Sequence, residues 1–177
     1  MSDSDITIEM VTDLAQAPGW IDMKREFLTL AAARHLNATG QVLDLEEQLH
    51  HTVAKIDTFL GEDGRFFVAR SEAGKLVGMV LLHRLASGKG EVKRMFIRPE
   101  ARRLGLARKL MDKLETEARA MGLSALYLDT SSGLGEAIAF YKSLGFHDAP
   151  FDPSSVQDPE IAKHLVIMEK PLKFDAA

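Results

Sequence analysis

Residues 91–108, EVKRMFIRPEARRLGLAR, decide the fold and are the best guide to the chemistry. They read as a strand, an arginine-rich loop, a glycine and the beginning of a helix. Arg98-Pro99 ends the strand, because proline lacks the N–H that the interior of a sheet would use. A helix N-terminus presents unpaired N–H groups and the positive end of the helix dipole, which bind phosphate well. The stretch therefore predicts a site for a ligand that carries phosphates.

The charge of the chain is unevenly distributed around this stretch. Seven of the 22 Lys and Arg residues lie between positions 93 and 109, where Glu100 is the one acidic residue, although the whole chain has a net charge of −4. A basic segment in an acidic protein favours a local site for a polyanion, and phosphates are the obvious candidates. The alternative is an ordinary solvated run of charge. The overall charge argues against a nucleic-acid-binding protein.

The helix that follows is predicted to run over residues 105–121. Leu106, Leu110, Leu114 and Ala118 give it one apolar stripe. Gly105 allows the backbone to come close to a ligand. The loop does not match the phosphate-binding patterns G-x-x-x-x-G-K-S/T or G-x-G-x-x-G.

Strands and helices can be predicted on both sides of this stretch. Alternating or continuous apolar runs indicate strands over residues 6–11, 65–70, 75–84, 91–97, 125–128 and 163–170. Helical spacing predicts further helices over residues 20–36, 45–60 and 134–144. This order indicates an α+β fold with one largely antiparallel sheet, whose central parallel pair is joined by the 105–121 helix. We expect a single domain over residues 1–177, with a core of about 6–172.

Composition excludes several other classes of protein. The 177 residues contain no cysteine, so disulfides, thiolate metal sites and a cysteine nucleophile are ruled out. No apolar run approaches the roughly 20 residues that span a bilayer. The chain begins with the acidic sequence MSDSD, which is not a secretory signal. We expect a cytoplasmic protein that uses no metal and binds neither membrane nor nucleic acid.

Two motifs, which follow one another along the chain, resemble the motifs of a known protein family. Arg102-x-x-Gly105-x-Ala107 is similar to the acyl-CoA signature R/Q-x-x-G-x-G/A of the GNAT superfamily of N-acetyltransferases. Farther along the chain, Ala137-x-x-Phe140-Tyr141-x-x-Leu144-Gly145-Phe146 resembles the second motif of that family, A-x-x-x-Y-x-x-x-G-F. The resemblance covers about residues 6–172. At the position where many members carry an asparagine that contacts the cofactor, this chain has Leu134.

The resemblance implies a GNAT-like mixed sheet, flanked by helices, whose central parallel strands splay apart. The pantetheine arm of acetyl-CoA, the co-substrate, would enter between these strands, and its pyrophosphate would lie on the amides of residues 103–108. The cofactor-binding residues that the resemblance implies are Met95, Phe96, Ile97, Arg102, Arg103, Leu104, Gly105, Leu106, Ala107, Arg108, Ala137 and Phe140.

The same resemblance points to two catalytic residues. An alkylamine is mostly protonated at neutral pH, so attack on a thioester needs a base or a desolvating site. Glu91 lies where the histone-acetylating members place their base, although Lys93 and Arg94 would keep its pKa low. Tyr141 matches the family's general acid, and His83 is a second possible base.

The acceptor is expected to be a primary amine of a small molecule, an amino acid or a peptide. It would attack acetyl-CoA directly in a ternary complex. The two N-terminal helices and the acidic loop of residues 148–160 would surround it, and acidic walls favour a cationic acceptor. Transfer of a longer acyl group, such as succinyl, and a non-catalytic acyl-CoA sensor are the alternatives. A homodimer is possible.

Overall fold

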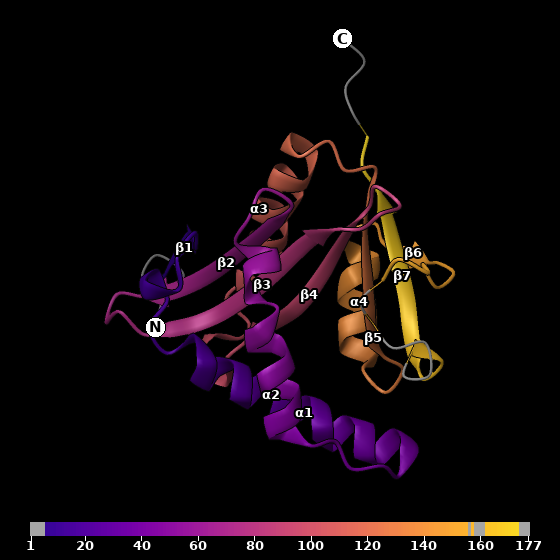
Figure 1. Cartoon of the computed structure of the whole chain (residues 1–177), viewed down its shortest axis with the longest axis horizontal. Helices are drawn as coiled ribbons and strands as arrows, with labels where there is room; N and C mark the ends of the chain where they lie inside the picture. The colour runs from indigo at the N-terminus through magenta and orange to yellow at the C-terminus, as the bar shows by residue number, and fades with distance from the viewer. Residues whose placement is uncertain (1–5, 156, 158–161, 174–177) are drawn as a thin grey trace.

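The computed structural model describes residues 6–155, 157 and 162–173, and a mixed sheet forms its centre. The strands lie in the order β1-β2-β3-β4-β5-β7-β6 (Figure 1), with β4 and β5 as the parallel pair. Their bounds are β1 Ile6–Met10, β2 Gly64–Ser71, β3 Leu76–Arg84, β4 Gly90–Ile97, β5 Ala125–Ser131, β6 His147–Asp148 and β7 Leu165–Pro171.

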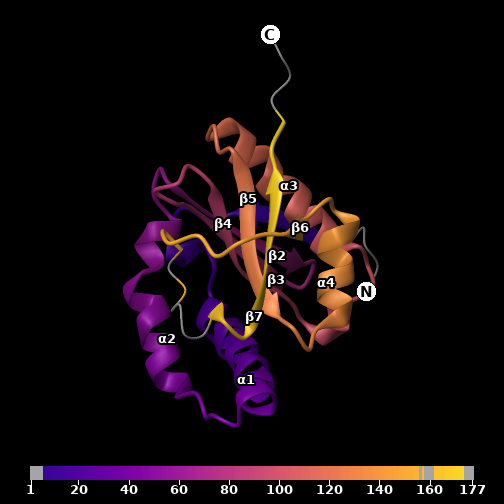
Figure 2. The same cartoon turned by 90° about the vertical axis from the view of Figure 1, so that its right-hand side faces the viewer.

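Helices cover both faces of the sheet. Their bounds are α1 Trp20–Thr39, α2 Leu45–Ala54, α3 Leu106–Ala120 and α4 Gly135–Ser143, with short 3₁₀ helices at Leu14–Gln16, Ile56–Phe59 and Pro99–Ala101. In Figure 2, α1 and α2 lie on one side of the strands and α3 and α4 on the other. None of the helices within the described ranges combines the length and the apolar character needed to cross a membrane.

Alternation along the strands creates two separate cores. Phe67 and Ala69 of β2 face the α3 side, where they pack with Leu110 and Leu114 of that helix. Successive strand residues point to opposite faces. Phe66 therefore faces the α1 side and packs in the second core around Trp20 and Met23. The sheet is thus buried on both faces, which fixes its register.

The central parallel pair separates along its length. Strands β4 and β5 pair at Gly90 with Leu126 and at Glu91 with Tyr127, and no later residue of β4 pairs with β5 in the described structure. The register between β3 and β4 shifts near Val80, and Arg94 takes a φ of 57° there. Such a bulge bends a strand and increases its twist. The splayed strand pair implied by the family resemblance is confirmed.

The predicted strands and helices are present. However, α1 and β5 each run three residues beyond their predicted ends, β6 was not predicted, and the second helix needs a correction. That helix was expected over residues 45–60, but α2 ends at Ala54 and a 3₁₀ helix follows at Ile56–Phe59. Three residues complete a 3₁₀ turn, so Ile56 and Phe59 face the same side, and both are buried. The apolar spacing that predicted one helix is therefore shared between two elements, and Val53 is exposed.

Candidate active site

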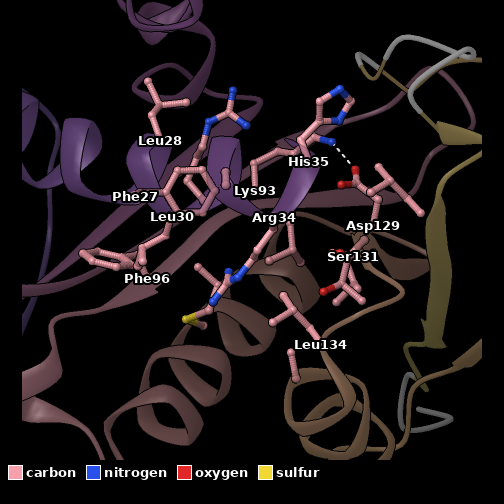
Figure 3. A pocket seen from close by; sticks show the side chains of 18 of the residues that line it. Phe27, Leu28, Leu30, Arg34, His35, Lys93, Phe96, Asp129, Ser131 and Leu134 are labelled. Carbon is pink, nitrogen blue, oxygen red and sulfur yellow. Dashed lines mark hydrogen bonds and ion pairs between the residues drawn. The ribbon is translucent and has the colours of Figure 1, made fainter. Parts of the chain in front are cut away.

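A cavity of about 530 Å³ opens where β4 and β5 separate. Residues of β4 and β5 form its walls, α1 closes one side and α4 contributes the opposite side (Figure 3). The separation of the strands leaves backbone groups of β4 without a neighbouring strand on this side. An extended ligand can use such groups as a further strand would.

Helix α3 begins beside the same cavity, and Ala107 of its first turn lines it. Gly105 caps the helix with a φ of 71°, and Arg103 has a φ of 66°. A side chain at Gly105 would meet no atom within 4 Å, so the left-handed backbone, rather than crowding, requires glycine. Lys109 makes the first helical bond, to the carbonyl of Gly105, at 3.2 Å. No acceptor within the described residues receives the N–H groups of residues 103–108, so these donors remain available for an anion.

Some of the predicted cofactor residues line the cavity, and the others do not. Arg102 lines the cavity, and its Nε donates to the carbonyl oxygen of Ile97 at 3.1 Å. Arg108 instead bonds to the hydroxyl of Ser143 at 3.1 Å. The predicted residues that line the cavity are Met95, Phe96, Ile97, Arg102, Ala107, Ala137 and Phe140. Those that the cavity wall does not include are Arg103, Leu104, Gly105, Leu106 and Arg108.

Tyr141 lies at the α4 side of the cavity. It is buried, it lines the cavity, and its ring packs edge-on against Phe146 at a centroid distance of 5.6 Å. Burial, helped by the negative charge of Asp129, raises the pKa of the Tyr141 phenol well above its usual value. The hydroxyl therefore stays protonated at neutral pH, as a proton donor must.

Glu91 lies behind the cavity wall rather than in it. Its carboxylate is fully buried and accepts from Ser155 Oγ at 2.5 Å, and it contacts His83 Nε2 at 2.7 Å and Lys93 Nζ at 3.0 Å. Burial alone would raise the pKa of Glu91, but the His83 hydrogen bond and the Lys93 charge lower it to about 2. His83 is also buried and is not part of the cavity wall. Both residues are therefore placed to organise the wall from behind.

Lys93 connects this buried carboxylate to the cavity. Its ammonium group lies 2.5 Å from Asp129 Oδ2, the pair drawn with a dashed line in Figure 3, and both residues line the cavity. Asp129 lies near the end of the strand that precedes α4, and an aspartate before a helix can cap it through its carboxylate. The structure excludes the cap, because α4 begins after Leu134 without a side-chain cap. Asp129 therefore lines the cavity together with Tyr141, and Glu136 of α4 is a second carboxylate in the wall.

Helix α1 supplies residues that the sequence did not single out. Phe27, Arg34 and His35 line the cavity (Figure 3), although His35 was expected to be an ordinary helix residue. Burial, followed by the positive charge of Arg102, lowers the pKa of Arg34. Arg94 of β4 also lines the cavity. Helical spacing alone could not show that these side chains share a wall with β4.

Of the acidic loop that was expected to surround the acceptor, Gln157 lines the cavity, whereas Asp148 and Asp152 do not. Asp148 is exposed, and Asp152 is buried, where it accepts from the hydroxyls of Ser87 at 2.7 Å and Ser154 at 2.6 Å. Neither carboxylate lines the cavity. Asp158 and Glu160 lie outside the described residues. Within the described part of the chain, no group of three or more His, Cys, Asp or Glu residues is arranged to hold a metal ion.

Comparison with known proteins extends these findings. Residues 29–146 match the model of the acetyltransferase (GNAT) family. The chain is 43% identical over 119 residues to an IAA acetyltransferase of Azospirillum brasilense, covering 66% of this chain and 74% of the relative.

Solved structures share the fold over nearly the whole chain. A GNAT-family acetyltransferase of Staphylococcus aureus Mu50 has a TM-score of 0.72 at 22% identity, covering 94% of this chain and 100% of the other. The PaiA N-acetyltransferase of Thermoplasma acidophilum, solved in complex with coenzyme A, has a TM-score of 0.67 at 21% identity, covering 93% and 99%.

Proposed function

This chain belongs to the GNAT acetyltransferase family, and on that premise we propose that it transfers the acetyl group of acetyl-CoA to a primary amine. The acceptor is a small molecule, an amino acid or a peptide, and it attacks directly in a ternary complex. One observation carries the proposal. The gap between β4 and β5 opens into one cavity, whose wall includes Arg102 and Ala107 from the segment that carries the unpaired N–H groups at the start of α3.

The two ends of the cavity suit the two ends of the co-substrate. Backbone groups of Met95, Phe96 and Ile97 border the gap and would pair with the pantetheine arm. The N–H groups of residues 103–108 would hold the pyrophosphate, with Arg102 adding positive charge. Ala137 and Phe140 line the α4 side of the gap. Acetyl-CoA supplies the thioester, and these residues fix its position.

Tyr141 is the proposed general acid. A buried phenol with a raised pKa keeps its proton until the thiolate leaves, and it lines the cavity where the thioester would end. Tyr141→Phe keeps the ring and removes only the hydroxyl. We expect it to slow thiol release about 100-fold, within the usual range for loss of a general acid, with little change in acetyl-CoA affinity. Equal turnover in variant and wild type would remove Tyr141 from the mechanism.

The contacts of Glu91 suggest how it serves the acceptor end. Its carboxylate is held by His83, Ser155 and Lys93, and a pKa of about 2 makes it a weak direct base. We therefore assign Glu91 a positioning role. It holds Lys93, which in turn holds Asp129 at the cavity surface. Asp129 is placed to orient the attacking amine.

Binding of acetyl-CoA tests the proposal directly. Acetyl-CoA at millimolar concentration should raise the melting temperature, because a ligand that binds the folded state stabilises it. Gly105→Asp should abolish this rise, since a carboxylate would repel the phosphates. Gly105→Asn is the matched control, because asparagine also tolerates the left-handed backbone but carries no charge. An unchanged melting temperature of the wild type would contradict the proposed function.

A further inference from the structure

Two basic side chains meet at the ring of Phe27. Burial lowers the pKa of Arg94, and the negative charges of Asp129 and Glu91 act against that lowering. Lys24 of α1 is 1% exposed, and its Nζ makes no hydrogen bond. Arg94 of β4 lines the cavity. Both groups lie against the ring of Phe27, with Lys24 Nζ 4.8 Å and Arg94 Cζ 5.9 Å from its centroid. Neither makes an ion pair with any described residue.

Three carboxylates that could neutralise Lys24 or Arg94 are engaged by other cations. Asp129 and Glu91 contact Lys93 at 2.5 and 3.0 Å. Glu26 of α1 binds the guanidinium of Arg98, with Oε1 2.7 Å from Nη2. These carboxylates are therefore paired with other cations, and Lys24 and Arg94 have no ion pair among the described residues.

Arg94 is held in its position at a cost. Its φ of 57° is a conformation that residues other than glycine seldom adopt, and such strain persists where the surroundings require it. Its one hydrogen bond, from Nη2 to Thr52 Oγ1, is long at 3.4 Å. A guanidinium offers five donors in a fork that matches a carboxylate. Most of that capacity is unused in the structure.

We propose that the acceptor carries a carboxylate, which Arg94 binds at the α1–α2 end of the cavity, with Lys24 behind Phe27, where a bound carboxylate would favour the charged form of its amine. This inference rests on the proposed transferase function and narrows its acceptor to an amine that also bears an acid, such as a free amino acid. Such an acceptor has a lower net charge than the cationic acceptor that the sequence favoured.

The arrangement along β4 suits such a molecule. Lys93, which holds Asp129, and Arg94 are consecutive, and the Cα atoms of consecutive residues are about 3.8 Å apart. Asp129 and Arg94 both line the cavity, so a molecule bound there can present its amine to Asp129 and its carboxylate to Arg94. Phe27, Leu30 and Leu43 also line the cavity. These side chains favour an acceptor with an apolar side chain.

Matched acceptor pairs test the inference. L-leucine and L-phenylalanine are compared with their amides, which keep the amine and the side chain but lack the charge, and free CoA thiol is followed. We expect the wild type to favour each acid by about tenfold or more in kcat/KM. Arg94→Gln should reduce kcat/KM for the acids about 10- to 100-fold, mainly through KM, and leave the amides unchanged. Lys24→Met should act in the same direction with a smaller effect.

The control is Arg25→Gln, which removes a cation from the same helix at an exposed position. It should leave the preference for acids intact. Amides that react as well as acids in the wild type, or a preference that survives Arg94→Gln, would overturn the inference while leaving the transferase function in place.

A binding measurement decides the matter if none of these amines reacts. Titration calorimetry of L-leucine into the protein with CoA should give heat in the wild type and none in Arg94→Gln. No binding of either amino acid to the wild type would overturn the inference. Failure of the transferase proposal has a separate signature, the unchanged melting temperature with acetyl-CoA.

Discussion

Two groups of buried ionisable side chains lie on the α1 face of the sheet, and they differ in their partners. Glu91, in the first group, contacts His83, Lys93 and Ser155, each within 3.0 Å. Lys24, in the second group, is about as buried but has no hydrogen-bond partner for its ammonium group. Glu91 has its polar partners within the protein, whereas the ammonium group of Lys24 has none among the described residues.

The pKa values of the two groups express this difference. Hydrogen bonds and the charge of Lys93 outweigh burial at Glu91 and lower its pKa to about 2, so the fold favours the charged form. Burial, reinforced by the charge of Arg94, lowers the pKa of Lys24 to about 6, so the fold opposes the charged form. A paired buried charge can serve the fold, whereas an unpaired one weakens it. A position that weakens the fold is more readily explained by a ligand.

Breaking the paired group should have the largest effect. Glu91→Gln leaves Lys93 and His83 without their buried carboxylate, which should lower the free energy of unfolding at pH 7 by about 3 kcal/mol or more. The folded pKa of Glu91 lies below its ordinary value of 4.5, so its stabilisation is present above pH 4.5 and is lost as pH falls towards 2. Urea denaturation at pH 7 and near pH 3 should therefore show a large difference between variant and wild type that shrinks in acid.

The exposed Glu46 provides the control for this variant. Its side chain is 74% exposed, so Glu46→Gln should change stability by less than about 1 kcal/mol. An alternative outcome would reassign Glu91. If Glu91→Gln keeps its stability but loses turnover, and the loss shrinks at high pH where amines lose their own protons, Glu91 accepts the proton itself.

The fold could be predicted because its signals are local. Gly105 and the apolar stripe through Leu110 and Leu114 lie within one segment, and they gave α3 nearly its full length. The hairpin of β2 and β3 was equally accessible, since a tight turn joins two apolar runs. The helix over residues 45–60 was wrong in its second half, because a 3₁₀ turn repeats apolar residues at a spacing close to that of an α-helix.

Part of the cavity wall at the proposed cofactor end was also predictable, whereas the wall at the proposed acceptor end was not. Residues such as Arg102 and Ala107 belong to one short motif and line the cavity as expected. The acceptor end depends on Arg94, whose orientation is set by a bulge that interrupts the alternation of β4. The second basic side chain at Phe27, Lys24, belongs to α1, which is far from Arg94 in the sequence. The sequence pattern gives no indication that these two side chains meet at Phe27.

Removing the unpaired cation should have a smaller effect of opposite sign. Lys24→Met keeps most of the side-chain volume and should raise the free energy of unfolding by about 2 kcal/mol at pH 7. Between pH 6 and 10.5 the unfolded wild type binds the Lys24 proton more tightly than the folded form does. Wild-type stability therefore rises with pH across this window, by at most about 1.4 kcal/mol per pH unit.

The advantage of Lys24→Met should accordingly be greatest below pH 6 and should fade as pH approaches 10.5. Urea denaturation of both proteins at pH 6, 8 and 10 measures this trend, and Arg25→Gln on the exposed side of α1 should show none of it. A variant that is less stable than the wild type at every pH would mean that the Lys24 ammonium is satisfied in solution. The contrast between the two buried groups would then disappear, because Glu91 and Lys24 would both have polar partners without a bound ligand.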